Sequence, residues 1–159
     1  MRLSLVEIVL FAAAAIVVAT ALPRCSGGSS RGLVVPASWT LTPGVLNPSV
    51  TQANIASTIC RRGWTRTVRP PVSYTNGLKA KGLRQYRLRG PPSAFQEDHL
   101  ISLELGGDPV DPRNLWPEPY PRASAVDQIE NDLNHRVCTG SLSLADAQRR
   151  ESAIKHSDG

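Results

Sequence analysis

The sequence predicts a small α+β domain, in which two short strands and a helix form the centre and further short helices surround it. The chain has 159 residues, which suits one domain of ordinary size. Its hydrophobic content of 41% is too high for a disordered chain, while 13 prolines and 12 glycines indicate many loops. The middle of the chain follows the order strand, loop, strand, helix.

Residues 1–21 are predicted to be a secretory signal peptide. The run Leu3–Leu22 is largely apolar, follows the basic residue Arg2 and contains Ala19-Thr20-Ala21, a small-x-small cleavage site. An uncleaved anchor helix is the alternative, because about 20 apolar residues also span a bilayer. In both cases we expect the rest of the chain outside the cytoplasm, secreted, periplasmic or in the cell envelope. In the second case residues 3–22 tether it to a membrane.

The remaining chain is predicted to consist of a leader and one domain. Residues 22–42 are Gly/Ser-rich at their start and lack apolar periodicity, so we expect a flexible leader there. Residues 43–159 are expected to form the domain. Within it, Asn47-Pro48 combines an N-cap with a proline at the first helical position, which predicts a short helix over 48–59.

The next two segments are predicted to be a loop and a weak helix. Residues 61–74 contain Pro70-Pro71, which indicates an extended loop. A loose helical spacing of Leu78, Leu83 and their neighbours predicts a weak helix near 75–87.

Two strands are predicted in the centre of the domain. The segment 98–105 alternates in a way that places one set of side chains on a single face, which is typical of a strand. Gly106-Gly107 ends it, and residues 108–113 form a loop. Residues 114–116 return as a second short strand, which ends at Pro117.

Two helices are predicted after the strands. Ser124 is expected to cap the first, which carries an apolar stripe. The stripe comprises Val126, Ile129, Leu133 and Val137. Gly140 ends this helix, and Ser143 begins a last helix that runs to about residue 155.

Charge is divided unequally along the chain. Residues 22–96 hold eleven basic residues and no acid, whereas residues 97–159 hold twelve acids and six bases. This division indicates a polyanion as partner for the first half and a cation, or catalysis, for the second; a merely solvated basic surface is the alternative. Arginines with aromatic residues between them suit phosphate and base contacts. The candidate nucleic-acid ligands are Arg61, Arg62, Arg66, Arg69, Lys79, Lys81 and Arg84.

The cysteines predict one disulfide. Cys60 and Cys138 each follow an apolar helix-like run, whereas Cys25 lies in a Ser/Gly stretch. In an oxidising compartment we therefore expect Cys60 to pair with Cys138. A loop of that length stabilises a fold by roughly 4 kcal/mol in the chain-entropy model. No cysteine or histidine spacing of the structural zinc type is present in the sequence.

The central residues also follow a characteristic order of short motifs. Asp98-His99 stands at the start of the first predicted strand, and Gly106-Gly107 stands at its end. Asn114-Leu115 opens the second strand, ahead of the helix. Over about residues 96–135 this order resembles the HNH nuclease motif.

The resemblance extends to the flanks, where Thr42–Pro48 and Val68–Pro71 look like a group of small secreted bacterial proteins with the same centre. It implies a ββα-metal centre and a metal-dependent endonuclease that hydrolyses phosphodiester bonds of DNA, RNA or both with low sequence specificity. The implied cofactor is a divalent ion, Mg²⁺ in the first place, with Mn²⁺ or Zn²⁺ as alternatives. The implied partner is a nucleic-acid substrate.

Each candidate site residue has a role in that reaction. Hydrolysis of a phosphodiester needs a base for water and a cation for the leaving oxygen. His99 suits the base, because a neutral imidazole titrates near physiological pH. The resemblance assigns metal binding to Asp98, and it assigns to Asn114 the holding of the hairpin loop and the orientation of His99. Arg113, or an arginine of the basic half, is expected to stabilise additional charge on the phosphate.

The helix departs from the resemblance. HNH proteins usually place a metal-binding histidine about eight or nine residues after the asparagine, where this chain has Arg122 and Ala123. The acids available instead are Asp127 and Glu130, and counting about 100° per residue puts Glu130 nearer the buried face. Asp127 has a second interpretation, because it forms a capping-box variant with Ser124.

Two other function classes stay open. A non-catalytic secreted binding or structural module could keep the ββα scaffold without metal, and the missing helix histidine favours it. An interbacterial toxin would need an immunity partner. Nothing in the sequence indicates an obligate protein partner.

Overall fold

The computed structural model describes residues 33–159. The predicted signal peptide, the predicted membrane tether and the first part of the predicted leader lie outside the described residues. Within residues 33–159, no helix is long and apolar enough to cross a membrane.

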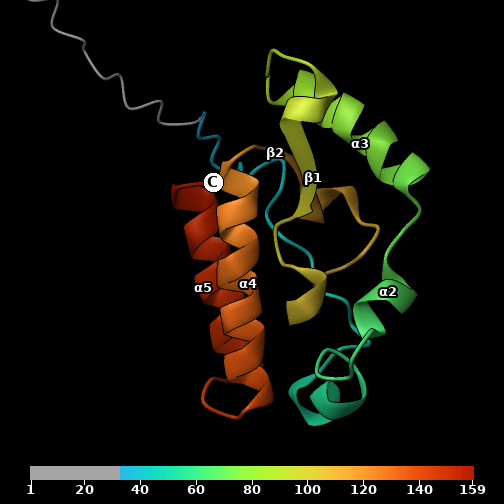
Figure 1. The fold of residues 1–159 in the computed structure, drawn as a ribbon, viewed down its shortest axis with the longest axis vertical. Coiled ribbons are helices and arrows are strands. Elements are labelled where there is room, and N and C mark those ends of the chain that lie inside the picture. The colour runs from blue at the N-terminus through green and yellow to red at the C-terminus, as the bar shows by residue number, and fades with distance from the viewer. Residues whose placement is uncertain (1–32) are drawn as a thin grey trace, which may run out of the picture. The chain divides into compact units, whose positions relative to one another are not determined.

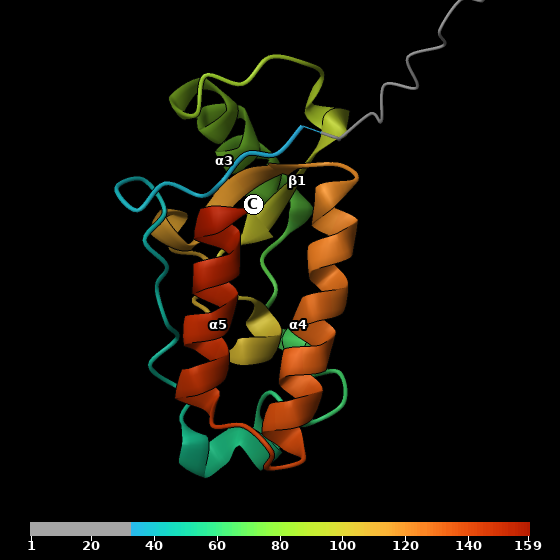
Figure 2. The same cartoon turned by 90° about the vertical axis from the view of Figure 1, so that its left-hand side faces the viewer.

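A two-stranded antiparallel sheet lies at the centre of the described residues, so the α+β class is confirmed (Figure 1). Its strands are β1 (Phe95–His99) and β2 (Leu115–Pro119). Helix α3 (Val72–Gln85) packs on the sheet, and α4 (Arg122–Cys138) also contacts both strands. Figure 2 shows α4 side by side with α5 (Leu144–Ser157), which runs antiparallel to it.

Strand β1 differs from the predicted strand over 98–105, because it ends where that segment begins. His99 pairs with Leu115 as the last pair of the ladder. Beyond it, the side chain of Asn114 accepts a hydrogen bond from the backbone N–H of Ile101 and donates one to its carbonyl, both at 3.0 Å. A side chain thus replaces the partner strand, and the chain bends into a 3-10 turn at Leu103–Leu105.

Strand β2 continues past Pro117, where the sequence predicts its end. In the ladder Pro117 lies opposite Glu97, and Pro119 lies opposite Phe95. A two-stranded sheet has positions that need no backbone donor, and proline is accepted there. Side chains alternate across the sheet. Pro117 therefore faces α3, where a Cβ at Gly82 would lie 2.9 Å from its ring, whereas Asp98 faces α5.

The N-terminal part of the domain differs from the prediction in the position and type of its helices. The helix expected over 48–59 is a 3-10 helix, Gln52–Ser57. The expected loop 61–74 contains α2 (Trp64–Val68). Pro71 lies at the N-cap of α3, so the proline pair begins a helix and does not prolong a loop. The weak helix near 75–87 is confirmed as α3, which begins three residues earlier.

The two C-terminal helices are confirmed, with one correction at the start of α4. This helix begins at Arg122 behind Pro121, so Ser124 lies inside it and caps nothing. The capping box of Ser124 with Asp127 is therefore wrong. Ser143 does cap α5, since its hydroxyl accepts a hydrogen bond from the N–H of Asp146 at 3.1 Å.

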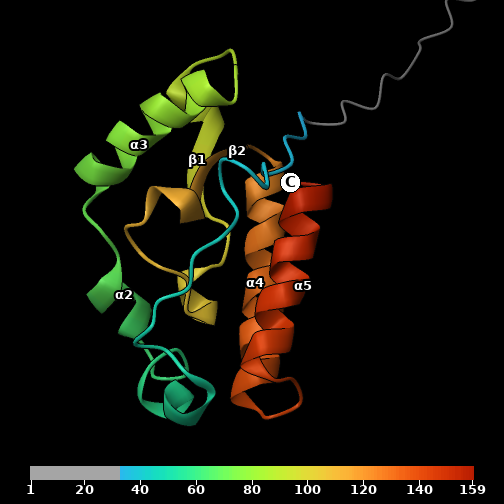
Figure 3. The same ribbon diagram turned by 180° about the vertical axis from the view of Figure 1, so that it is seen from behind.

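The described part of the predicted flexible leader is packed against the domain. The N–H of Ala37 donates to the carbonyl of Lys155 at 2.9 Å, and Thr42 is buried beside the hydroxyl of Tyr86. The ring of Trp39 stacks on His156 with 3.5 Å between centroids, which ties this segment to the last turn of α5. Figure 3 shows this segment running along the molecule from the C-terminal end of α5.

The predicted disulfide is confirmed. Cys60 is bonded to Cys138, with 5.5 Å between their Cα atoms. It joins the segment before α2 to the last residue of α4, next to the main apolar core. The core contains Val50, Ile59, Ile101, Leu105, Leu133, Val137, Leu144 and Ala147. The disulfide thereby attaches the segment with Arg61 and Arg62 to the helix that carries Asp127 and Glu130.

Candidate functional site

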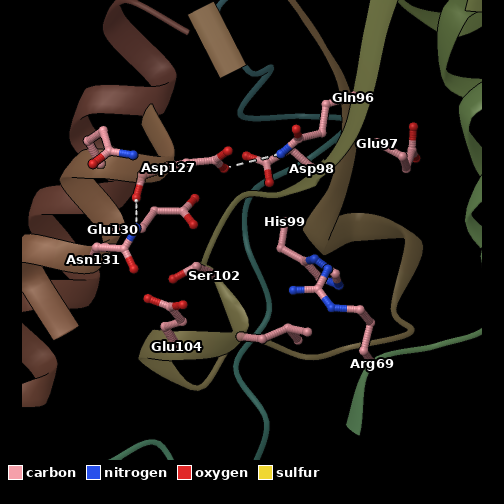
Figure 4. Close-up of a pocket in the computed structure, with 12 residues that line it drawn as sticks. Arg69, Gln96, Glu97, Asp98, His99, Ser102, Glu104, Asp127, Glu130 and Asn131 are labelled. Carbon is pink, nitrogen blue, oxygen red and sulfur yellow. Dashed lines mark hydrogen bonds between the residues drawn. The ribbon is translucent and has the colours of Figure 1, made fainter. Parts of the chain in front are cut away.

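A polar pocket of about 460 Å³ opens between the end of β1, the turn at Leu103–Leu105 and α4 (Figure 4). Its wall is polar apart from Leu103 among the described residues. The lining side chains are Arg69, Gln96, Glu97, Asp98, His99, Ser102, Leu103, Glu104, Asp127, Gln128, Glu130 and Asn131. Many oxygen atoms and almost no apolar surface suit a charged ligand better than an apolar one.

The three predicted metal ligands meet in this pocket. One carboxylate oxygen from each of Asp98, Asp127 and Glu130 lies within 4.8 Å of the other two. Asp98 comes from β1, and the other two lie three residues apart on α4, which places them on one side of the helix. Three carboxylates form a hard oxygen donor set, which fits Mg²⁺, Mn²⁺ or Ca²⁺ better than Zn²⁺.

Asp127 is held toward the pocket by the neighbouring strand. Its carboxylate accepts a hydrogen bond from Nε2 of Gln96 at 3.2 Å, and its backbone carbonyl accepts one from Nδ2 of Asn131 at 2.7 Å (Figure 4). The side chain that the sequence offers as a helix cap therefore links α4 to β1.

A lysine outside the set of predicted site residues lies behind the carboxylates. Nζ of Lys155 donates to Oδ2 of Asp98 at 2.8 Å, to Oε1 of Glu130 at 2.5 Å and to the carbonyl of His99 at 2.5 Å. A carboxylate oxygen of Glu151, one turn earlier on α5, lies 3.4 Å away. Lys155 is fully buried. A buried charge of this kind persists only where it is paired.

Burial and Lys155 together set the ionisation of this cluster. Burial is the largest influence on Asp98 and opposes its charge, but the charge and the hydrogen bond of Lys155, with smaller contributions from other neighbours, together outweigh it, so the pKa of Asp98 is lowered. Burial raises the pKa of Glu130 well above its ordinary value against the same attraction. Burial raises the pKa of Glu151 to about 7, and burial with the charge of Asp98 raises that of Glu118, a buried residue of β2, to about 8. The cluster is therefore partly protonated near neutral pH.

His99 is held as a neutral imidazole. Its Nε2 lies 3.1 Å from the carbonyl oxygen of Pro109, which can only accept, so Nε2 carries the proton. This leaves Nδ1 as the nitrogen that can take a proton from water. Burial lowers the pKa of His99, and the nearby charge of Arg69 lowers it further, against the carbonyl of Pro109 and the charge of Asp98. The imidazole is therefore neutral at neutral pH.

Asn114 holds the loop that positions His99. Besides the two hydrogen bonds to Ile101, its Nδ2 donates to the carbonyl of Asp108 at 2.9 Å, and its Oδ1 accepts from the N–H of Val45 at 3.3 Å. The carbonyl of Pro109 that contacts His99 belongs to the same loop. Gly107 is required here, because a Cβ at this position would lie 1.8 Å from the carbonyl oxygen of Ile101.

Arg113 does not lie where the expected role requires it. Its guanidinium forms a two-point ion pair with Asp111, at 3.0 Å from Nε and 2.6 Å from Nη2. The side chain is exposed, and Arg113 is not among the residues that line the pocket. The local Asp-x-Arg pairing therefore takes this arginine away from a catalytic position.

The candidate nucleic-acid ligands are spread over several surfaces. Arg69 follows the last residue of α2 and lines the pocket (Figure 4). Arg61 and Arg62 line a second hollow of about 300 Å³, which shares Glu104 with the pocket. Nζ of Lys79 donates to the carbonyl of Phe95 at 3.1 Å.

The remaining three ligands of that set lie elsewhere. Lys81 lines a small hollow beside α3. Arg66 on α2 and Arg84 on α3 are exposed and line none of these hollows. The structure thus brings Arg69 into the pocket and Arg61 and Arg62 next to it, and it leaves the other members of the set outside.

One signal in the sequence points to Lys155. Leu144, Ala147, Glu151 and Lys155 recur at helical spacing, and all four are buried in α5. A glutamate and a lysine four residues apart on the apolar stripe of a helix indicate a buried ion pair, since such charges are otherwise excluded from a core. The spacing does not reveal Asp98 and Glu130 as the further partners.

Comparisons with protein-family models, with curated proteins and with solved structures give no match for this chain. The chemistry of the site therefore follows from its own residues. These residues provide a neutral imidazole, three carboxylates able to share a cation, and an arginine around one polar pocket.

Proposed function

We propose that this protein is a metal-dependent nuclease that hydrolyses phosphodiester bonds of DNA or RNA with low sequence specificity. One observation supports the proposal most strongly. His99 lines the same pocket as Asp98, Asp127 and Glu130. A base and a cation site next to each other are what hydrolysis of a phosphodiester requires.

In the proposed reaction, His99 activates the attacking water. Nδ1 takes one proton, the water oxygen bonds to phosphorus, and the bond from phosphorus to the leaving oxygen breaks; solvent protonates the leaving oxygen. The carbonyl of Pro109 keeps its contact with Nε2. The charge that forms on the imidazole lies beside the carboxylate of Asp98, which favours it.

Asp98, Asp127 and Glu130 would hold the divalent ion, which supplies positive charge for the phosphate and the leaving oxygen. Arg69 reaches the same pocket from the opposite wall. Its guanidinium suits two oxygens of one phosphate. Low sequence specificity is proposed because no Phe, Tyr or Trp side chain lines this pocket among the described residues, and phosphate contacts carry no base information.

The proposed location is outside the cytoplasm, secreted or in the cell envelope. The disulfide Cys60–Cys138 is compatible with an oxidising compartment. The apolar segment at the start of the sequence supports the same location.

A second candidate function is a binding module without catalysis. Lys155 favours it, because its ammonium already neutralises part of the charge of Asp98 and Glu130. Such a module would bind nucleic acid through its arginines and need no divalent ion.

Incubation of the purified chain with plasmid DNA and with single-stranded RNA, with Mg²⁺, with Mn²⁺ or with EDTA, tests the proposal. We expect cleavage only with a divalent ion. Asp98→Asn should abolish it, whereas Asp111→Asn, a change in an aspartate that lines no part of this pocket, should retain it. If the chain binds either nucleic acid but cleaves neither of them with Mg²⁺, with Mn²⁺ or with EDTA, the result would favour the binding module.

A further inference from the structure

Lys155 has a place in the cluster that a purely structural lysine does not need. Its ammonium is enclosed by four oxygen atoms, from Asp98 at 2.8 Å, Glu130 at 2.5 Å, the carbonyl of His99 at 2.5 Å and Glu151 at 3.4 Å. Three carboxylate oxygens and one backbone carbonyl are also the ligands that a hard metal ion takes in proteins. The lysine therefore occupies a cage of the kind that binds cations.

This cage shares two carboxylates with the candidate metal site. Asp98 and Glu130 line the pocket, and each also accepts a hydrogen bond from Lys155 behind it. Lys155 itself does not line the pocket and is fully buried, so it meets neither substrate nor solvent. In two-metal phosphodiesterase sites, carboxylates bridge two cations that lie about 3.5–4 Å apart. Here a lysine stands on one side of the shared carboxylates.

We infer that Lys155 is a positioning residue that takes the place of a second cation, orienting Asp98 and Glu130 and limiting the pocket to one divalent ion. The inference deepens the proposed function, because it rests on a metal ion in the pocket. The ammonium is covalently tethered and cannot dissociate. It already occupies one oxygen each of Asp98 and Glu130, so a second ion cannot bind these oxygens.

The physical reason lies in the cost of buried charge. Without a cation in the cage, Asp98, Glu130 and Glu151 would face one another in a buried space, where like charges repel and are poorly solvated. Truncation of the lysine side chain to alanine leaves the carboxylates without a positive charge and also leaves space for an ion. Replacement by methionine also removes the positive charge, but the methionine side chain fills the space that an ion would need.

Counting bound Mn²⁺ by electron paramagnetic resonance on the full chain tests this inference. We expect one Mn²⁺ per wild-type chain and two per Lys155→Ala chain, with the spectral broadening of two coupled ions. Lys155→Met should bind one, because its side chain fills the cage. Lys79→Ala is the matched control, since that lysine bonds to a backbone carbonyl outside the cage, and it should bind one.

Thermal unfolding keeps the test decisive if Lys155→Ala folds poorly. The variant should then regain its cooperative transition with Mn²⁺, and its Tm should rise further with Mn²⁺ than that of the wild type. A Lys155→Ala chain that binds no more Mn²⁺ than the wild type, or that stays unfolded at saturating Mn²⁺, overturns the inference.

The two proposals fail in different ways. One Mn²⁺ in the wild type and one in Lys155→Ala leaves the metal-dependent nuclease standing and removes the role of Lys155. No Mn²⁺ in the wild type with one in Lys155→Ala supports the lysine as a tethered cation and removes the metal-dependent function.

Discussion

The two walls of the pocket are built in opposite ways. On the acidic wall, formed by β1 and α4 with α5 behind them, Asp98 and Glu130 are buried and bound to Lys155. On the basic wall, Arg69 is exposed, as are Arg61 and Arg62 in the adjoining hollow. Within residues 33–159, none of these three arginines forms an ion pair with an acidic side chain.

The difference indicates that the two walls have separate roles, one in the reaction and one in substrate binding. Buried and mutually bonded groups keep one arrangement and act in a low dielectric, which is what a reaction centre needs. Exposed arginines are free to meet a phosphate, and their attraction is screened by salt. We therefore expect changes on the acidic wall to alter the rate of cleavage, and changes on the basic wall to alter substrate affinity.

The largest expected effect comes from His99, the proposed base on the acidic wall. His99→Ala should lower kcat by about 10²–10⁴-fold with little change in KM, because it removes proton transfer but no phosphate contact. Initial rates of plasmid nicking over a range of substrate concentrations check this. A variant that retains its rate would remove His99 from the mechanism.

The disulfide joins Cys60, in the segment before Arg69, to Cys138 at the end of α4. Breaking it should therefore loosen the basic wall from the acidic wall. Cys60→Ser or Cys138→Ser is expected to cost roughly 2–5 kcal/mol in the free energy of unfolding. Urea unfolding measures the loss, and activity should fall under reducing conditions. Cys25→Ser is the control and should change neither, since Cys25 lies in the Ser/Gly stretch. A free thiol at Cys60 in the native protein would contradict the pairing.

A smaller effect is expected on the basic wall. Arg69→Ala should raise KM by about tenfold, leave kcat closer to the wild-type value, and reduce the salt slope of binding by about one. Fluorescence anisotropy at several salt concentrations, together with cleavage kinetics, measures these quantities. Arg149→Gln is the control, because that arginine pairs with Asp146 on an exposed part of α5. A loss confined to kcat would instead make Arg69 a group that acts in the transition state.

The smallest effect is expected for Arg113. Because its guanidinium is paired with Asp111 outside the pocket, Arg113→Ala should leave both kcat and KM within experimental error. The same kinetic assay checks this beside Arg69→Ala. A rate loss equal to that of His99→Ala would restore the catalytic role that the sequence suggests.

Several parts of the site were predictable because their signals are local. Asp98-His99, the glycine pair and Asn114 follow one another within a short segment, and the apolar stripe of α4 places Glu130 near the buried face. The pairing of Cys60 with Cys138 followed from the ends of two apolar runs, and it is confirmed.

Other parts depend on contacts between distant residues and could not be predicted in this way. Strand β1 ends at His99 because the side chain of Asn114 bonds to Ile101, and no alternation of apolar residues reveals that. Lys155 is buried because Asp98 lies beside it, 57 residues away in the chain. The role of Asp127 changed because α4 begins two residues before Ser124.

The most direct test of the central claim is a crystal structure of the wild-type chain soaked with Mn²⁺ and measured at its anomalous edge. We predict one anomalous peak in the pocket, about 2.0–2.2 Å from oxygens of Asp98, Asp127 and Glu130, with Lys155 still bound behind them. No peak in the pocket at saturating Mn²⁺, or a peak coordinated by other residues, would contradict the account.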